Sequence, residues 1–195
     1  MKKSLHDIAI NIFSNCIQNQ ISLEAEWIPR SENEVADYFS KMYDYDDWSI
    51  SDTVFQFFNN KWGPYDVDLF ADCNNFKVTK FFSKFWTPGT SGVDALVFNW
   101  KDFNAWIVPP VCMVPAVINH MLLCRAKGTL VVPKWTSSCF WPLLVDGVGH
   151  FKAFVVDYYE YVKPRNFFLP GSDGKSIFAQ PKFMSNVLVL KLNCQ

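Results

Sequence analysis

Two different hydrophobic patterns follow each other in the N-terminal part of the chain. Apolar residues from Leu5 to Cys16 recur every three or four positions, which predicts a helix over roughly residues 4–18. From Ser22 to Ile28 apolar and acidic residues alternate, and this period of two predicts a half-exposed strand. Pro29 would end that strand, because proline cannot donate to a sheet ladder.

A capping box follows the predicted strand. Ser31 and Glu34 have the Ser-x-x-Glu spacing that starts helices, and apolar residues continue at helical spacing to Met42. The pattern ends in a short acidic and aromatic run at residues 43–47. We therefore predict a domain boundary there, with residues 1–47 in one unit and residues 48–195 in another.

The second unit begins with a further predicted helix. Ser51 would cap it, and Gly63-Pro64 would end it, because glycine accepts a left-handed C-cap and proline cannot continue a helix. Beyond it, short apolar runs typical of buried strands alternate with a helical segment. The predicted strands are 66–71, 105–108, 129–132, 152–161 and 186–192, and the helix is 118–125. This alternation predicts an α/β fold with a mainly parallel, Rossmann-like sheet.

Composition supports a packed domain and excludes some classes of protein. Hydrophobic residues make up 50% and aromatic residues 17% of the chain, so disorder is excluded over most of its length. The net charge is -1, with 18 basic and 19 acidic residues. Phosphate neutralisation usually needs a basic excess, so any nucleic-acid binding must come from a local patch.

Cysteine usage and the apolar segments indicate the compartment. The six cysteines include no Cys-x-x-Cys pair, and the three histidines are not spaced with them as zinc ligands are. The N-terminus does not have the pattern of a secretory signal, and prolines interrupt the most apolar region, residues 106–123. We therefore expect an intracellular protein with free thiols that does not span a membrane.

One stretch of the first unit carries a motif. Residues 27–41 read Trp-Ile-Pro-Arg-x-Glu-Asn-x-x-Ala-Asp-x-x-Ser-Lys. This resembles the end of the ribonuclease H domain that follows reverse transcriptase in DIRS-type retroelements, and residues 23–41 resemble the last strand and helix of that fold. The resemblance implies that Asp37 is the last metal-binding aspartate, with Mg²⁺ as the metal and an RNA–DNA hybrid as the substrate.

The chemistry argues against ribonuclease activity in this chain alone. Such hydrolysis needs two divalent cations held by several carboxylates, and magnesium binds a lone carboxylate weakly. Upstream of Trp27 the only acids are Asp7, Glu24 and Glu26, and none can replace the early strands of that fold. We interpret Asp37 as an ancestral catalytic and metal-binding residue that is inactive unless another chain completes the site.

The second unit contains a second candidate motif, made of six short segments in a fixed order. They are residues 67–71, Asn75 with 81–82, 94–96, Trp100, 106–110 and 128–133. Their order resembles a phage-type DNA adenine methyltransferase domain, a kind of domain that also follows ribonuclease H in DIRS-like elements. The resemblance implies S-adenosylmethionine as the cofactor and Asp68 and Asp94 as residues that bind it. It also implies that Pro109 and Pro110 are a degenerate catalytic motif.

Two departures from that family count against methyl transfer. In the family, Asn or Asp before the Pro-Pro pair accepts a hydrogen bond from the amine of the flipped base, and an aromatic residue after it stacks on that base. Here the flanking residues are Val108 and Val111, which can do neither. An unpaired amine costs about 1–3 kcal/mol. Residues 68–73 also lack a glycine for close approach to a cofactor.

A further segment, residues 76–86, interleaves three lysines with five aromatic residues. Cations beside aromatic rings are how proteins bind single strands without sequence preference, so the candidate nucleic-acid-binding residues are Lys77, Lys80 and Lys84. The alternative is that the rings belong to the core and the lysines cover its outer face. The high aromatic content favours this alternative for Phe81, Phe82, Phe85 and Trp86.

Three functions therefore stay open. The first is a fragment of a retroelement reverse transcriptase/ribonuclease H polyprotein, inactive by itself, whose remaining partners would be the rest of that polyprotein and DNA or an RNA–DNA hybrid. The second is an S-adenosylmethionine-dependent DNA adenine methyltransferase. The third is a ribonuclease completed by another chain. We favour the first, because a lone carboxylate and a valine-flanked proline pair leave both sites incomplete.

Overall fold

The structure is a computed structural model that describes residues 5–24, 26–29, 32, 48–170, 178 and 183–195. The chain forms two compact units, Met1–Tyr43 and Asp44–Gln195. Asp37 and the helix expected after Ser31 lie outside the described residues.

In the first unit the helix α1 spans Leu5–Gln18, as the apolar stripe predicts. Its apolar side chains are exposed, among them Ile8, Ile12 and Phe13. The strand expected at residues 22–28 is wrong for the positions described there, which are neither helix nor strand. Alternation produces a strand only where a neighbouring strand pairs with its backbone, and no described pairing involves these residues.

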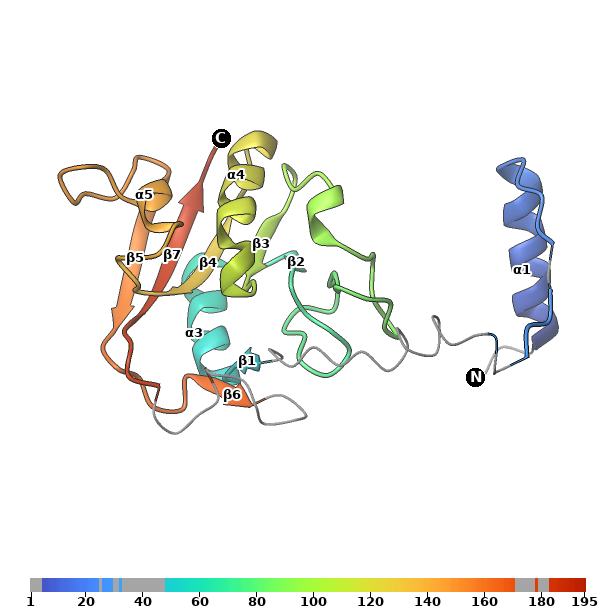
Figure 1. The fold of residues 1–195 in the computed structure, drawn as a ribbon, viewed down its shortest axis with the longest axis horizontal. Coiled ribbons are helices and arrows are strands. Elements are labelled where there is room, and N and C mark those ends of the chain that lie inside the picture. Colours follow the sequence, from blue (N-terminus) through green and yellow to red (C-terminus); the bar gives the residue numbers. More distant parts are fainter. Residues whose placement is uncertain (1–4, 25, 30–31, 33–47, 171–177, 179–182) are drawn as a thin grey trace. The chain divides into compact units, whose positions relative to one another are not determined.

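The second unit is built on a five-stranded sheet with the order β2-β3-β4-β7-β5 (Figure 1). Strands β2, β3 and β4 are parallel, whereas β7 is antiparallel to both of its neighbours. The strands span Val67–Asp68 (β2), Asn104–Ile107 (β3), Lys127–Pro133 (β4), Val155–Tyr161 (β5) and Val187–Asn193 (β7). The predicted α/β class is confirmed, and the fold fits a methyltransferase-like domain.

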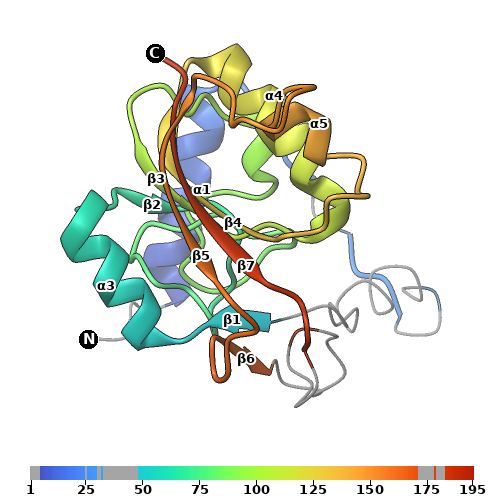
Figure 2. The same cartoon turned by 90° about the vertical axis from the view of Figure 1, so that its left-hand side faces the viewer.

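Two layers cover this sheet, one on each face (Figure 2). The helices α4, Val114–Cys124, and α5, Trp141–Leu144, pack on one face. The helix α3, Asp52–Trp62, covers the other face, together with a ribbon of β1, Trp48–Ile50, and β6, Phe168–Pro170. Side chains alternate along a strand, so β3, β4, β5 and β7 each contribute to both cores. In β4, Leu130 and Val132 face α4 whereas Val131 faces α3.

The helix α3 begins and ends where the sequence predicts, with Ser51 as N-cap and Gly63 as C-cap. The reason predicted for the glycine is wrong, because Gly63 has φ -81° and ψ -162° and is extended rather than left-handed. Glycine is needed for another reason: a Cβ at this position would collide with the carbonyl oxygen of Asn59. A close approach of the backbone therefore selects glycine here.

Other boundaries differ from the sequence prediction. Strand β2 is shorter than the expected 66–71, and α4 starts at Val114 rather than at residue 118. The ribbon strands β1 and β6 and two short 3₁₀ helices, η1 (Ala95–Val97) and η2 (Val111–Met113), were not predicted. Within the described ranges, no helix has the length and apolar character needed to cross a membrane.

Candidate active site

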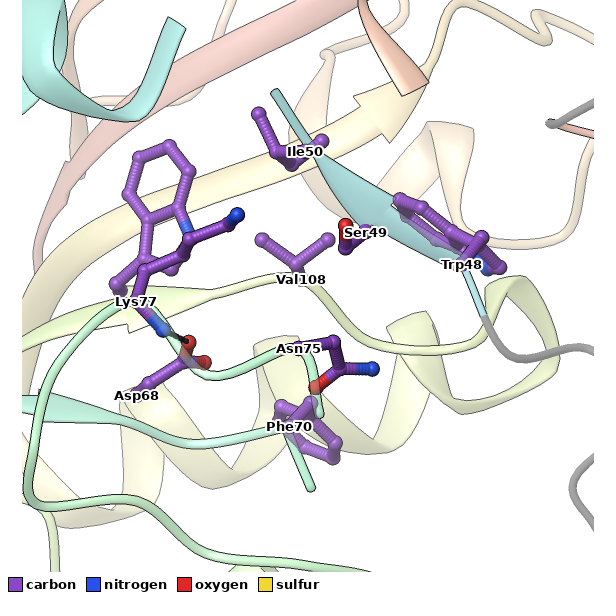
Figure 3. A pocket seen from close by; sticks show the side chains of 9 residues that line it. Trp48, Ser49, Ile50, Asp68, Phe70, Asn75, Lys77 and Val108 are labelled. Carbon is purple, nitrogen blue, oxygen red and sulfur yellow. Dashed lines mark hydrogen bonds between the residues drawn. The ribbon is translucent and has the colours of Figure 1, made fainter. Parts of the chain in front are cut away.

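A small, open hollow lies where β2 and β3 end and faces the ribbon strand β1 (Figure 3). Its lining combines three segments that are far apart in the sequence. These are β1, the segment that runs from β2 into the following loop, and the end of β3. The lining residues are Trp48, Ser49, Ile50, Asp68, Phe70, Asn75, Lys77, Trp106 and Val108.

Asp68 is the most deeply buried acidic residue of this hollow, with 2% of its surface exposed. Its backbone N–H donates to the carbonyl of Lys80, and its carbonyl accepts from Phe82, so the residue is held firmly within the sheet. In the side chain, Oδ2 accepts a hydrogen bond of 3.0 Å from the backbone N–H of Lys77. Oδ1 has no hydrogen-bond partner in the described part of the chain. Leaving a buried carboxylate oxygen without a donor is costly, and such an atom is a natural ligand contact.

Burial also changes the acidity of this carboxyl group. Removal from water raises the pKa of Asp68 to about 7, while the backbone N–H groups of Lys77 and Phe70 beside the carboxylate oppose the rise. Near neutral pH the carboxyl group therefore exists in both protonation states. Strongly shifted carboxyl groups in a hollow are typical of functional sites.

The loop after β2 is organised by Asp72 and Asn75 rather than by glycine. Asp72 Oδ1 accepts hydrogen bonds from the backbone N–H groups of Asn74 and Asn75, at 2.6 and 3.1 Å. In return, Asn75 Oδ1 accepts from the backbone N–H of Asp72 at 2.7 Å. These side chains form the kind of turn that Asp and Asn favour, which explains how the loop is built without a glycine.

The proline pair marks the end of β3 at the edge of the hollow. Val108 and Trp106 both line the hollow, since alternate residues of a strand face the same side. Pro109 is buried, and Pro110 precedes η2 and accepts a hydrogen bond of 2.9 Å from the backbone N–H of Met113. The prolines thus turn the chain from the sheet into α4, and a valine occupies the position that faces the hollow.

A model of the DNA N-6-adenine-methyltransferase (Dam) family matches residues 40–191. The chain belongs to this family. A search of curated proteins found no match. The Dam match supports the methyltransferase alternative better than the retroelement fragment that the sequence led us to favour. The matched range begins after Asp37, so the resemblance to ribonuclease H and the retroelement origin are not supported by it and stay predictions.

Membership of the Dam family implies use of S-adenosylmethionine and suggests DNA as the substrate. Magnesium has no such support. In the ranges that the structure describes, no group of three His, Cys, Asp or Glu side chains could hold a metal ion. Asp37, the predicted metal ligand, lies outside those ranges, so its role is not tested.

The second predicted cofactor residue, Asp94, does not line the hollow. Its Oδ1 accepts a hydrogen bond of 3.1 Å from the backbone N–H of Leu96 and so caps the short helix η1. Asp94 is exposed and has φ 60°, a left-handed conformation that Asp tolerates better than most residues. The structure thus brings Asp68 and the end of β3 together but leaves Asp94 outside the hollow.

The three candidate lysines have different surroundings. Lys77 Nζ lies 2.6 Å from Asp52 Oδ1, Lys80 Nζ lies 4.0 Å from the ring centre of Phe103, and Lys84 Nζ lies 5.3 Å from that of Phe85. Of the aromatic residues between them, Phe81 and Phe82 are buried, as predicted for core. The expectation that the remaining two belong to the core is wrong, since Phe85 is 38% and Trp86 is 76% exposed. Nucleic-acid binding by the lysines stays a prediction.

Sequence reasoning missed the contribution of β1 to the hollow. Trp48, Ser49 and Ile50 form a strand of three residues, which is too short to show a reliable period of two. The one local signal is the alternation of an aromatic, a polar and a β-branched residue. Their place beside Asp68 depends on pairing with β6, more than 100 residues away, which no local pattern reveals.

Proposed function

We propose that this chain is a DNA adenine methyltransferase that uses S-adenosylmethionine as its methyl donor. The observation that carries the proposal is the buried, unpartnered carboxylate oxygen of Asp68, in a hollow of a Dam-family domain. In open α/β sheets, ligands bind outside the carboxyl ends of the parallel strands. The hollow lies at that edge, beside the ends of β2 and β3.

The residues of the hollow fit the chemistry of this cofactor. S-adenosylmethionine carries hydroxyl and ammonium donors and an adenine ring, and when bound it supplies a methyl group activated by a positively charged sulfur. Asp68 Oδ1 can accept from one of the donors, and a charge-assisted bond of this kind is stronger than a neutral one. The side chain of Phe70, which is half-buried at the hollow, provides apolar surface for the ring.

A methyltransferase that acts on a base must take that base out of the helical stack. The loop from Phe76 to Trp86 provides exposed aromatic and cationic side chains that suit a displaced strand. Its members Lys84 and Trp86 are exposed, whereas the side chain of Lys77 is 11% exposed. We therefore propose Lys84 and Trp86, rather than Lys77, as the DNA-facing part of this loop.

A second candidate is a Dam-family domain that binds cofactor and DNA without transferring a methyl group. Val108 favours it, because valine cannot accept the amine proton of the target adenine. Val111 favours it as well, because its side chain is packed against both hydrophobic cores and has no ring to stack on a base.

One experiment separates the two candidates. Transfer of a tritiated methyl group from S-adenosylmethionine is measured on DNA duplexes with and without adenine, and cofactor binding is measured by calorimetry. The methyltransferase proposal requires label in the adenine-containing duplex alone. Binding without transfer would establish the second candidate, and absence of both would refute both.

A matched pair of variants then tests the role of Asp68. Asp68→Asn keeps the shape of the side chain but removes the charge, and we expect it to weaken cofactor binding at least about tenfold. Asp102→Asn removes an exposed carboxylate that does not line the hollow, and it should bind cofactor as the unmodified protein does. Equal affinities of the two variants would show that Asp68 is not a cofactor contact.

A further inference from the structure

The hollow lacks a hydrogen-bond acceptor at position 108 but offers one from another strand. Methylation of an exocyclic amine requires an acceptor that holds its proton and orients the nitrogen, and the side chain of Val108 has no polar atom. Three other lining residues carry a side-chain oxygen, namely Ser49, Asp68 and Asn75. Their surroundings show which of them could take over this role.

Two of the three oxygens are unsuited to the task. Asn75 Oδ1 already accepts from the backbone N–H of Asp72 at 2.7 Å, so this amide oxygen holds the loop in place. Asp68 Oδ1 is the group that the proposed function assigns to the cofactor. A second donor from the target base would compete with the cofactor for the same oxygen.

The hydroxyl of Ser49 is the remaining oxygen, and strand pairing fixes the position of this residue. Ser49 is the central residue of β1 and pairs with Leu169 of β6. Trp48 and Ile50, on either side of it, are buried in the aromatic core under α3. Since side chains alternate along a strand, Ser49 faces the other way, and Figure 3 shows its side chain pointing from β1 toward Val108. In the described ranges the Ser49 hydroxyl has no hydrogen-bond partner.

We propose that Ser49 accepts the hydrogen bond from the exocyclic amine of the target adenine, in place of the polar residue absent at position 108. This inference rests on the proposed function of the hollow. Trp48, on the same strand, is 9% exposed and packs its ring against Phe168 and Phe178, so it anchors β1 rather than contacting the base. The substrate contacts are thus divided between β1 and the loop after β2, and the proline pair only shapes the edge.

The test compares adenosine with purine riboside, which lacks the exocyclic amine. Trp48 and Trp106 line the hollow, so quenching of tryptophan fluorescence reports occupancy. The unmodified protein should bind adenosine about tenfold more tightly than purine riboside, the value of one hydrogen bond. Ser49→Ala should abolish this preference, whereas Ser49→Thr, which keeps a hydroxyl group, should retain it.

Two further variants control for indirect effects. Thr53→Ala removes an exposed hydroxyl of α3 that does not line the hollow, and it should keep the preference. In the double variant Ser49→Ala/Val108→Asn the acceptor moves to position 108, so the preference should return. Equal binding of both nucleosides by the unmodified protein, or an unchanged preference in Ser49→Ala, would overturn the inference.

Saturating S-adenosylhomocysteine distinguishes the target base from the adenine of the cofactor. If adenosine still binds with the same preference, Ser49 serves the target base. If S-adenosylhomocysteine displaces it completely, Ser49 serves the cofactor and the inference is wrong. A protein that prefers adenosine but transfers no methyl group would refute the methyltransferase proposal while supporting the role of Ser49. Methyl transfer that Ser49→Ala leaves unaffected would support the methyltransferase proposal and refute the role of Ser49.

Discussion

The buried carboxyl group of Asp68 makes the stability of the second unit depend on pH. Its pKa is raised to about 7 from an unperturbed value of 3.8, chiefly because the side chain is removed from water. The folded state therefore binds this proton more tightly than the unfolded state does. The resulting stabilisation is fully present below about pH 4 and is lost as the pH rises through 7.

The size of the effect follows from the shift. About three pKa units at 1.36 kcal/mol each correspond to about 4 kcal/mol of unfolding free energy between the two limits. Asp68→Asn cannot lose a proton and is free of this dependence. The difference in unfolding free energy, variant minus unmodified protein, should therefore increase by about 4 kcal/mol between pH 4 and pH 8.

Urea denaturation followed by tryptophan fluorescence measures this difference at several pH values and constant ionic strength. Taking the difference cancels the contributions of all other titrating groups. Asp102→Asn, at an exposed position, is the matched control for the loss of an acidic side chain. A difference that stays the same from pH 4 to pH 8 would show that Asp68 is not a buried carboxylate, and the reasoning about its unpaired oxygen would fail with it.

The same proton should affect cofactor binding. If a donor of S-adenosylmethionine binds Asp68 Oδ1, the ionised form of the carboxyl group is the better acceptor. Affinity should then fall by up to about tenfold for each pH unit below 7, and Asp68→Asn should remove this dependence. Calorimetry at pH 6 and pH 8 measures both effects, and a pH-independent affinity in the unmodified protein would argue against the contact.

Three other changes test the packing and the DNA-facing loop. Tyr65→Phe removes a buried hydroxyl that lies 2.7 Å from Thr129 Oγ1, and it should lower the unfolding free energy by about 1–3 kcal/mol because the threonine loses its partner. An unchanged midpoint of urea denaturation would contradict this buried hydrogen bond. Gly128→Ala would bring a methyl group to 2.5 Å from the carbonyl oxygen of Ala105, so β3 and β4 must separate. The unfolding free energy should fall by about 1–3 kcal/mol, and an unchanged value would mean that the two strands are not this close. Lys84→Ala should weaken the binding of single-stranded DNA and reduce the slope of log binding constant against log salt concentration by about one. An identical slope would show that Lys84 does not contact the DNA.

The family of the chain follows from the order of its motifs rather than from the degenerate proline pair. Val108 and Val111 led us to favour an inactive fragment, although the order of the neighbouring pieces already resembled an adenine methyltransferase. The Dam match over residues 40–191 gives the order of the pieces more weight than the loss of two side chains. The polar side chains of the hollow come from β1, from the end of β2 and from the loop after β2, so a valine at position 108 does not leave the hollow without polar groups.

Local sequence alone determined the elements whose stability is local. The helix α3 is recognisable from its caps and its apolar stripe, and β4 from a run of buried residues, because these signals act within a few positions. Tertiary structure decided the rest. The three residues of β1 become a strand only by pairing with β6, and the insertion of β7 between β4 and β5 depends on long-range pairing. The open oxygen of Asp68 and the position of Ser49 arise only when these distant segments meet, since burial and hydrogen-bond partners are properties of the assembled fold.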